Sequence, residues 1–180
     1  DQGADLSGDA GLPFSDDIDG ETRSGSWDIG SDETASLPSG PIYYSVGTDS
    51  AALYTGNASA SFGTLTLAGP AANNVGVGDE IRQGANRYYI TGRNSSTEFT
   101  IQNSAANGGT PGATNITFGS TPITIYRAFL TLSAAESGAA DSSHLNSSDL
   151  VAGNKQLMLA AYDDGAMNDG TIVIDGWTTG

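Results

Sequence analysis

Short β-type runs separated by turn residues dominate the middle of this sequence, and they restrict its fold more than any other feature. In residues 78–101, GDEIRQGANRYYITGRNSSTEFTI, three apolar or aromatic runs are divided by polar and glycine-rich residues at 84–86 and 94–96. Such residues favour tight turns between neighbouring strands. In the last run Phe99 and Ile101 alternate with polar residues, as a half-buried strand requires. The pattern predicts a β-meander.

Further runs of the same kind extend the meander in both directions, and it is expected to curl into a small barrel or a sandwich. The pattern does not choose between these two forms. Residues 104–122, rich in Gly, Asn and Thr, are predicted to form a long exposed loop. The expected strands cover residues 42–47, 52–54, 60–68, 75–84, 87–93, 97–103 and 123–129.

The periodicity becomes helical over residues 128–140, AFLTLSAAESGAA. Ser133 and Glu136 have the spacing of a capping box, and Gly138 is a plausible end of the helix. A second short helical turn is expected at 146–153. The sequence pattern of a β-strand then returns at 155–162, KQLMLAAY, and at 171–177, TIVIDGW. The fold class predicted for the whole chain is therefore all-β with one short helix.

Residues 1–40 have a different texture, because they contain many Asp, Gly and Ser residues and few β-branched ones. Such a segment buries too little apolar surface to order itself. We expect an extended acidic arm at 1–40, a meander or barrel at 41–127, and a capping helix with strands at 128–180.

The charge balance limits the partners that this chain can bind. The net charge is -15, from 21 acidic and 6 basic residues. This surface repels nucleic acid and anionic membranes, since both are bound through Lys and Arg. There is no Cys, which excludes disulfides and thiolate chemistry. The small-residue, turn-rich composition is typical of extracellular and cell-surface β proteins, and glycosylation sequons begin at Asn57, Asn94, Asn115 and Asn146.

Two segments resemble a known family. Residues 16–33 contain DIDGETR followed by WDIGSDE, which resembles the C-terminal closing motif of secreted and cell-surface right-handed parallel β-helix proteins of environmental bacteria, with Ser31 where Ala is usual. Residues 42–180, from IYYSVG to TIVIDGWTTG, resemble the opening of such a pectate-lyase-like module. The resemblance implies that a short capping helix precedes stacked parallel strands, and that a closing motif here comes before an opening one.

The first candidate site is a calcium loop in the arm. Ser15, Asp17, Asp19 and Gly20 match alternate oxygen positions and the glycine of a calcium-binding loop. The twelfth position is Ser26 in place of the usual Glu, and Glu21 is a further candidate ligand. Ca²⁺ at Asp17, Asp19 and Glu21 is one interpretation, and turn capping by the same residues is the other. A second acidic turn at 163–170 is explained by turn chemistry without a metal.

Catalytic residues are less evident. The only histidine, His144, lies in a polar stretch and is expected to be an exposed loop residue. A polysaccharide-degrading fragment would depend on Asp79, Glu80 or Arg82, although an acidic surface repels anionic glycans. Stacking of Trp27 and Trp177 on sugar rings is a further alternative to an apolar packing role. No cofactor is predicted with certainty, and the chain is not expected to be an enzyme.

Three functions follow from these observations. The first is an extracellular structural subunit whose arm docks on a neighbour by strand addition, giving a head-to-tail homopolymer. The second is a linker or capping module adjoining other β-helix modules in a larger adhesin-like surface protein. The third is the enzyme fragment. The residues expected at the assembly interface are Ile18, Trp27, Ile29, Tyr43 and Tyr44.

Overall fold

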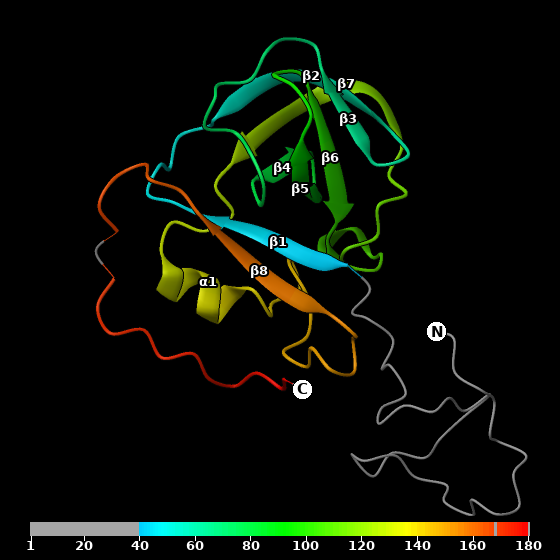
Figure 1. Cartoon of the computed structure of the whole chain (residues 1–180). Coiled ribbons are helices and arrows are strands. Elements are labelled where there is room, and N and C mark those ends of the chain that lie inside the picture. Colours follow the sequence, from blue (N-terminus) through cyan, green and yellow to red (C-terminus); the bar gives the residue numbers. More distant parts are fainter. Residues whose placement is uncertain (1–39, 168, 180) are drawn as a thin grey trace, which may run out of the picture. The chain divides into compact units, whose positions relative to one another are not determined.

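The computed structural model describes residues 40–167 and 169–179 (Figure 1). The chain divides into two units, Asp1–Leu37 and Pro38–Gly180, and the description below concerns the second. Within it the chain is mostly β with a single short helix, so the predicted all-β class is confirmed.

Six antiparallel strands form a closed barrel in the order β2-β3-β6-β5-β4-β7. The meander therefore becomes a barrel, not a sandwich. Closure pairs every barrel strand on both sides, which removes the exposed edges that open sheets must protect. The strands are β2 (Tyr54–Ser61), β3 (Thr64–Leu67), β4 (Glu80–Gln83), β5 (Asn86–Arg93), β6 (Glu98–Asn103) and β7 (Phe118–Tyr126).

The barrel interior is filled by alternate side chains of these strands. Leu65, Ile81, Phe99, Ile101 and Ile125 are all 0% exposed and belong to one apolar cluster. The alternation seen in the sequence of β6 is thus the alternation between the barrel interior and its surface.

The prediction of a long exposed loop at residues 104–122 is wrong in part. It contains a short 3-10 helix, η1 (Ala105–Asn107), and the beginning of β7. Phe118 pairs with Ala60 of β2, and Thr121 pairs with Ala58. Pairing across the barrel therefore places a polar, turn-like segment in a strand, because its backbone groups gain partners that local propensity cannot reveal.

A second, two-stranded sheet lies outside the barrel. β1 (Pro41–Val46) and β8 (Gln156–Ala161) run parallel and in register, with Pro41 opposite Gln156 and Val46 opposite Ala161. Figure 1 shows this pair between the barrel and the helix α1 (Leu132–Gly138). Ile42, Tyr44 and Val46 bury their side chains against α1 and part of β5 in a second apolar cluster. All six barrel strands therefore lie between β1 and β8 in the sequence, although β1 and β8 are neighbours in space.

The start of α1 differs from the predicted capping box. Thr131 is the N-cap, and its hydroxyl accepts a hydrogen bond from the Ala134 N–H at 3.0 Å. The Asp169 carboxylate accepts from the N–H groups of Leu132 at 2.8 Å and Ser133 at 3.4 Å. A distant segment therefore satisfies the N–H groups at the start of the helix. The helix ends at Gly138, as predicted.

Two further predictions are wrong. Residues 146–153 form turns in place of a helical turn, with the Ser147 hydroxyl accepting from the Asp149 N–H at 3.0 Å. Residues 171–175 form no strand, despite their β-branched sequence. Asp169 on one side and the bridge between Thr178 and Asp149 on the other hold the segment in the tertiary structure.

Gly78 allows β1 to approach the barrel, and this gives a stability prediction. Gly78 has φ +86°, and a Cβ there would collide with the backbone of Tyr44 and Ser45 in β1. Gly84 has φ +60° with no atom within 4 Å of the Cβ position, so it is a matched control. We expect Gly84→Ala to lower the free energy of unfolding by about 1–2 kcal/mol through its left-handed backbone alone. Gly78→Ala should cost clearly more in denaturant titrations, and equal costs would contradict the role assigned to this contact.

Candidate functional site

Among the described strands, β8 is the one that contains no buried residue. Its outer edge is a candidate site. β8 pairs with β1 on one side, and no described strand pairs with its other side. The Tyr162 N–H, just after β8, donates to the Val46 carbonyl at 2.8 Å. Because the bonding groups of a strand alternate in direction, the backbone groups of Leu157, Leu159 and Ala161 point to the outer edge.

The sequence of β8, QLMLAA, contains no charged residue and no proline. Natural edge strands are usually protected by charges, proline or bulges, since an unprotected edge recruits other strands. β8 lacks all three of these local protections, and the edge is therefore suited to pairing with another strand.

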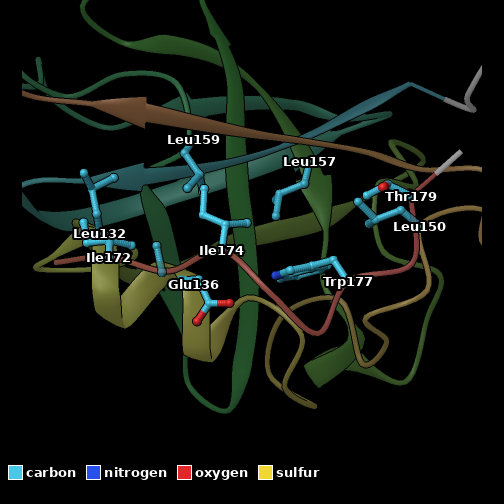
Figure 2. Close-up of a pocket in the computed structure, with 10 residues that line it drawn as sticks. Leu132, Glu136, Leu150, Leu157, Leu159, Ile172, Ile174, Trp177 and Thr179 are labelled. Atoms are coloured by element: carbon cyan, nitrogen blue, oxygen red, sulfur yellow. The ribbon is translucent and has the colours of Figure 1, made fainter.

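An apolar groove of about 400 Å³ lies beside this edge (Figure 2). Its walls come from α1, β8 and the segment 169–179, and Figure 2 shows aliphatic side chains from these elements around the groove, with the Trp177 ring at one side. The lining residues are Leu132, Ala135, Glu136, Leu150, Leu157, Leu159, Ile172, Ile174, Trp177 and Thr179.

Several side chains around the groove remain exposed. Leu159 is 41% exposed and Ile174 is 80% exposed. Val173, next to Ile174, is 63% exposed. A cluster of exposed aliphatic side chains beside an open strand edge is typical of an interaction surface, whereas single exposed apolar residues are ordinary.

The charged groups near the groove are acidic. Glu136 lines it and accepts a hydrogen bond from the Asp175 N–H at 3.4 Å. Asp169 contacts the start of α1. The ends of β8 differ in sign, because Lys155 precedes the strand and the exposed Asp163 follows it. The Lys155 ammonium group donates to the Pro111 carbonyl at 2.8 Å.

A buried ion-pair network attaches the end of β8 to the barrel. The Arg127 guanidinium, which follows β7, contacts Asp79 at 2.7 Å and Asp164 at 2.6 Å. Its side chain is 0% exposed. It lies over the Tyr162 ring at 3.6 Å, and the Tyr162 hydroxyl donates to the Val77 carbonyl at 2.9 Å. These contacts fix the position where the chain leaves β8.

The pKa values of the two carboxylates in this network are shifted in opposite directions. Burial raises the pKa of Asp79, although the Gly76 N–H and Arg127 oppose that shift. Hydrogen bonds from Arg127 lower the pKa of Asp164, which is only partly opposed by burial. Burial on its own would lower the pKa of Arg127, but the hydrogen bonds to Asp164 and Asp79 raise it. The guanidinium is therefore held in its charged form.

The expectation of an exposed His144 is wrong. His144 is 9% exposed and stacks on Phe129, with ring centroids 4.6 Å apart. It also contacts the rings of Tyr44 and Tyr89 in the second apolar cluster. Its Nδ1 lies 2.6 Å from the Asp141 carboxylate. Local polarity in the sequence gave no sign of this burial, because the aromatic partners come from β1, β5 and the segment after β7.

The other residues expected at sites are distributed as follows. Ile18, Trp27, Ile29 and the proposed calcium ligands Asp17, Asp19 and Glu21 lie outside the described residues. Tyr44 is fully buried in the second cluster, and burial raises the pKa of its hydroxyl. Tyr43 is partly exposed in β1, and its carbonyl accepts from Gln102 at 3.3 Å. Within the described ranges no group of three or more acidic or histidine side chains is arranged to hold a metal.

The residues on which a polysaccharide-degrading activity would depend take part in ion pairs. They are Asp79, Glu80 and Arg82. Asp79 contacts Arg127, as described above. Glu80 is largely buried and contacts both Arg82 and Arg87 at 2.8 Å. The second acidic turn is divided between two structural roles, since Asp164 contacts Arg127 and Asp169 caps α1. The four sequon asparagines Asn57, Asn94, Asn115 and Asn146 are exposed.

Comparisons with protein-family models, curated proteins and solved structures gave no match. The geometry therefore carries the interpretation of the site. In the part of the chain that the structure describes, α1 is too short to cross a membrane, and no other α-helix is present.

The network predicts a pH-dependent contribution to stability. Because the pKa of Asp164 is lowered in the folded state, its stabilising effect is complete above the unfolded value of about 3.9 and is lost as the pH falls below it. We expect Asp164→Asn to lower the free energy of unfolding by about 1.5–3 kcal/mol near pH 7. The difference from the native sequence should shrink in denaturant titrations below about pH 4.

The exposed neighbour Asp163 provides the control for that experiment. Asp163→Asn changes the net charge equally but leaves the Arg127 contacts intact. Its cost should be small at every pH. A similar loss in both variants would mean that net charge, and not the ion pair, carries the effect.

Proposed function

We propose that this chain is a structural module that presents the outer edge of β8 for strand addition. The observation that carries the proposal is the parallel, in-register β1–β8 pair with an uncharged outer edge and an apolar groove beside it. The barrel and α1 support this pair, and the buried Arg127 network fixes its end.

The physical argument concerns the size of the sheet. Parallel sheets occur almost always in larger assemblies with covered faces, and two strands alone make a marginal sheet. Here β1 is covered by the barrel and by the second apolar cluster, whereas the outer backbone groups of β8 have no partner strand among the described residues. A further strand would satisfy these groups and cover exposed aliphatic side chains such as Leu159.

This arrangement supports the interpretation as a capping module of a larger parallel β-helix. A short helix and a closed domain would cover one end of the stack, and coils would be added at the other, as terminal caps do in solenoid proteins. We propose an extracellular or cell-surface location and a non-enzymatic role. The engagement of Asp79, Glu80 and Arg82 in ion pairs supports a structural role for them.

Two proline variants test whether the edge accepts a strand. Ala161→Pro removes an N–H that points to the outer edge, whereas Ala160→Pro removes one that points to β1. We expect Ala161→Pro to remain folded but to bind short β-forming peptides at least about tenfold more weakly, since edge hydrogen bonds are lost. The measurement is protection of the β8 amides from hydrogen exchange.

The matched variant Ala160→Pro should instead lower stability and expose β1. If the native chain gains no amide protection along β8 from any peptide of a β-forming panel, the proposed function is wrong. Equal peptide binding by Ala161→Pro and the native chain would place the binding elsewhere.

The homopolymer is the second candidate, because the same edge would accept a strand from a neighbour's residues 1–39. The groove offers an apolar surface of the kind that Ile18, Trp27 and Ile29 would need. Deletion of residues 1–35 should then abolish any assembly seen by analytical ultracentrifugation. The deletion removes acidic residues, so the comparison should be made at about 0.15 M salt, where surface repulsion is screened. Assembly by the truncated chain would exclude the arm as the added strand.

A further inference from the structure

The side chains of β1 and β8 form rows that continue toward the groove. Ile42 lies opposite Leu157, Tyr44 opposite Leu159, and Val46 opposite Ala161. The β1 members of these rows are 0% exposed, whereas Leu159 is 41% exposed. The rows that reach Leu159 and Ala161 therefore begin in the core and end at an exposed side chain on β8, whereas Leu157 is partly buried against the second apolar cluster.

The groove shows which side chains would complete these rows. Leu157 and Leu159 line it from β8, and Ile172 and Ile174 line it from the segment 169–179 (Figure 2). An added strand that presents aliphatic residues at every second position would place them between these walls, because side chains alternate between the faces of a strand. Its backbone would meet the outward groups of Leu157, Leu159 and Ala161.

Charge further restricts the partner. The groove wall contains Glu136, and Asp175 lies next to it, within a chain of net charge -15. An acidic strand would add repulsion at this surface, whereas a neutral or basic one would not. The exposed Asp163 after the end of β8 also complements a parallel strand that carries a basic residue at its C-terminal end.

We propose that the partner is a neutral or basic polypeptide strand with alternating aliphatic side chains, which adds parallel to β8 and continues the side-chain rows into the groove. The inference rests on the proposed function and specifies its partner. It favours a coil of such strands over the acidic segment 16–33 of a second copy, which contains seven acidic residues and one arginine.

Synthetic peptides of matched composition test this chemistry. The probe is Thr-Ile-Thr-Ile-Thr-Val-Thr-Lys, with Ile-Ile-Val-Thr-Thr-Thr-Thr-Lys as the control that loses alternation. Replacing the final Lys by Glu gives the control for charge. We expect the alternating basic peptide to protect the amides of Leu157, Leu159 and Ala161, and the two controls to bind at least about threefold more weakly.

Strand direction is measured with a nitroxide label on the N-terminus of the alternating peptide. Parallel addition should broaden the NMR signals near Gln156, at the start of β8, more than those near Ala161. Stronger broadening near Ala161 would show antiparallel addition and would overturn the inference.

Leu159 and Met158 provide matched variants of the chain itself. They are 41% and 42% exposed, but they lie on opposite faces of the strand, and only Leu159 lines the groove. Leu159→Ser should weaken binding of the alternating peptide at least about fivefold, whereas Met158→Ser should leave it unchanged. Equal effects of the two variants would exclude the groove as the site of contact.

The outcomes separate this inference from the function on which it rests. Absence of protection with every peptide would overturn strand addition itself. Protection that is equal for alternating, non-alternating and acidic peptides would leave strand addition standing and overturn the chemistry assigned to the partner. Tighter binding of a peptide copying residues 16–33 would also overturn it, in favour of the homopolymer.

Discussion

The buried guanidinium of Arg127 is the interaction on which the arrangement of the two sheets depends. It joins Asp79, which precedes β4, to Asp164, which follows β8. A buried cation without its carboxylates would be strongly unfavourable, so Arg127 needs these partners in the folded state. Because the partners are far apart in the sequence, the network forms only when barrel and β8 are both in place. It thereby couples the position of the exposed edge to the folded barrel.

Close backbone contacts extend this coupling along β1. The Ser45 N–H donates to the Gly78 carbonyl at 2.8 Å, and the Phe129 N–H donates to the Ser45 carbonyl at 3.0 Å. β1 is therefore held by the barrel side of the molecule as well as by β8. The consequence is an asymmetric sheet, in which one strand is largely buried and the other offers an edge. The proposed capping role would use this asymmetry, since strands would then be added on one side only.

The second apolar cluster holds β1 in place, and β1 in turn pairs with β8. Tyr44 of β1 contacts Tyr89 of the barrel and Phe129, in edge-to-face geometry. His144 completes the cluster by stacking on Phe129. α1 packs on the same cluster through Ala135, and its first N–H groups are satisfied by Asp169. The segment that forms one wall of the groove therefore also caps the helix that forms another wall.

The sequence by itself determined the all-β class, the strands β4 to β6 with their turns, the end of α1 at Gly138 and the β texture of residues 155–162. These features are local, since alternation and turn residues act over a few positions. The absence of charge in QLMLAA was also readable, and it is the signal that could have identified the edge. Only the tertiary structure decided that β8 pairs with β1, that His144 is buried, that Asp169 caps α1 and that residues 171–175 form no strand. Each of these depends on residues that are distant in the chain. Their contacts outweigh local propensity, because tertiary neighbours decide which groups are buried and which hydrogen bonds form.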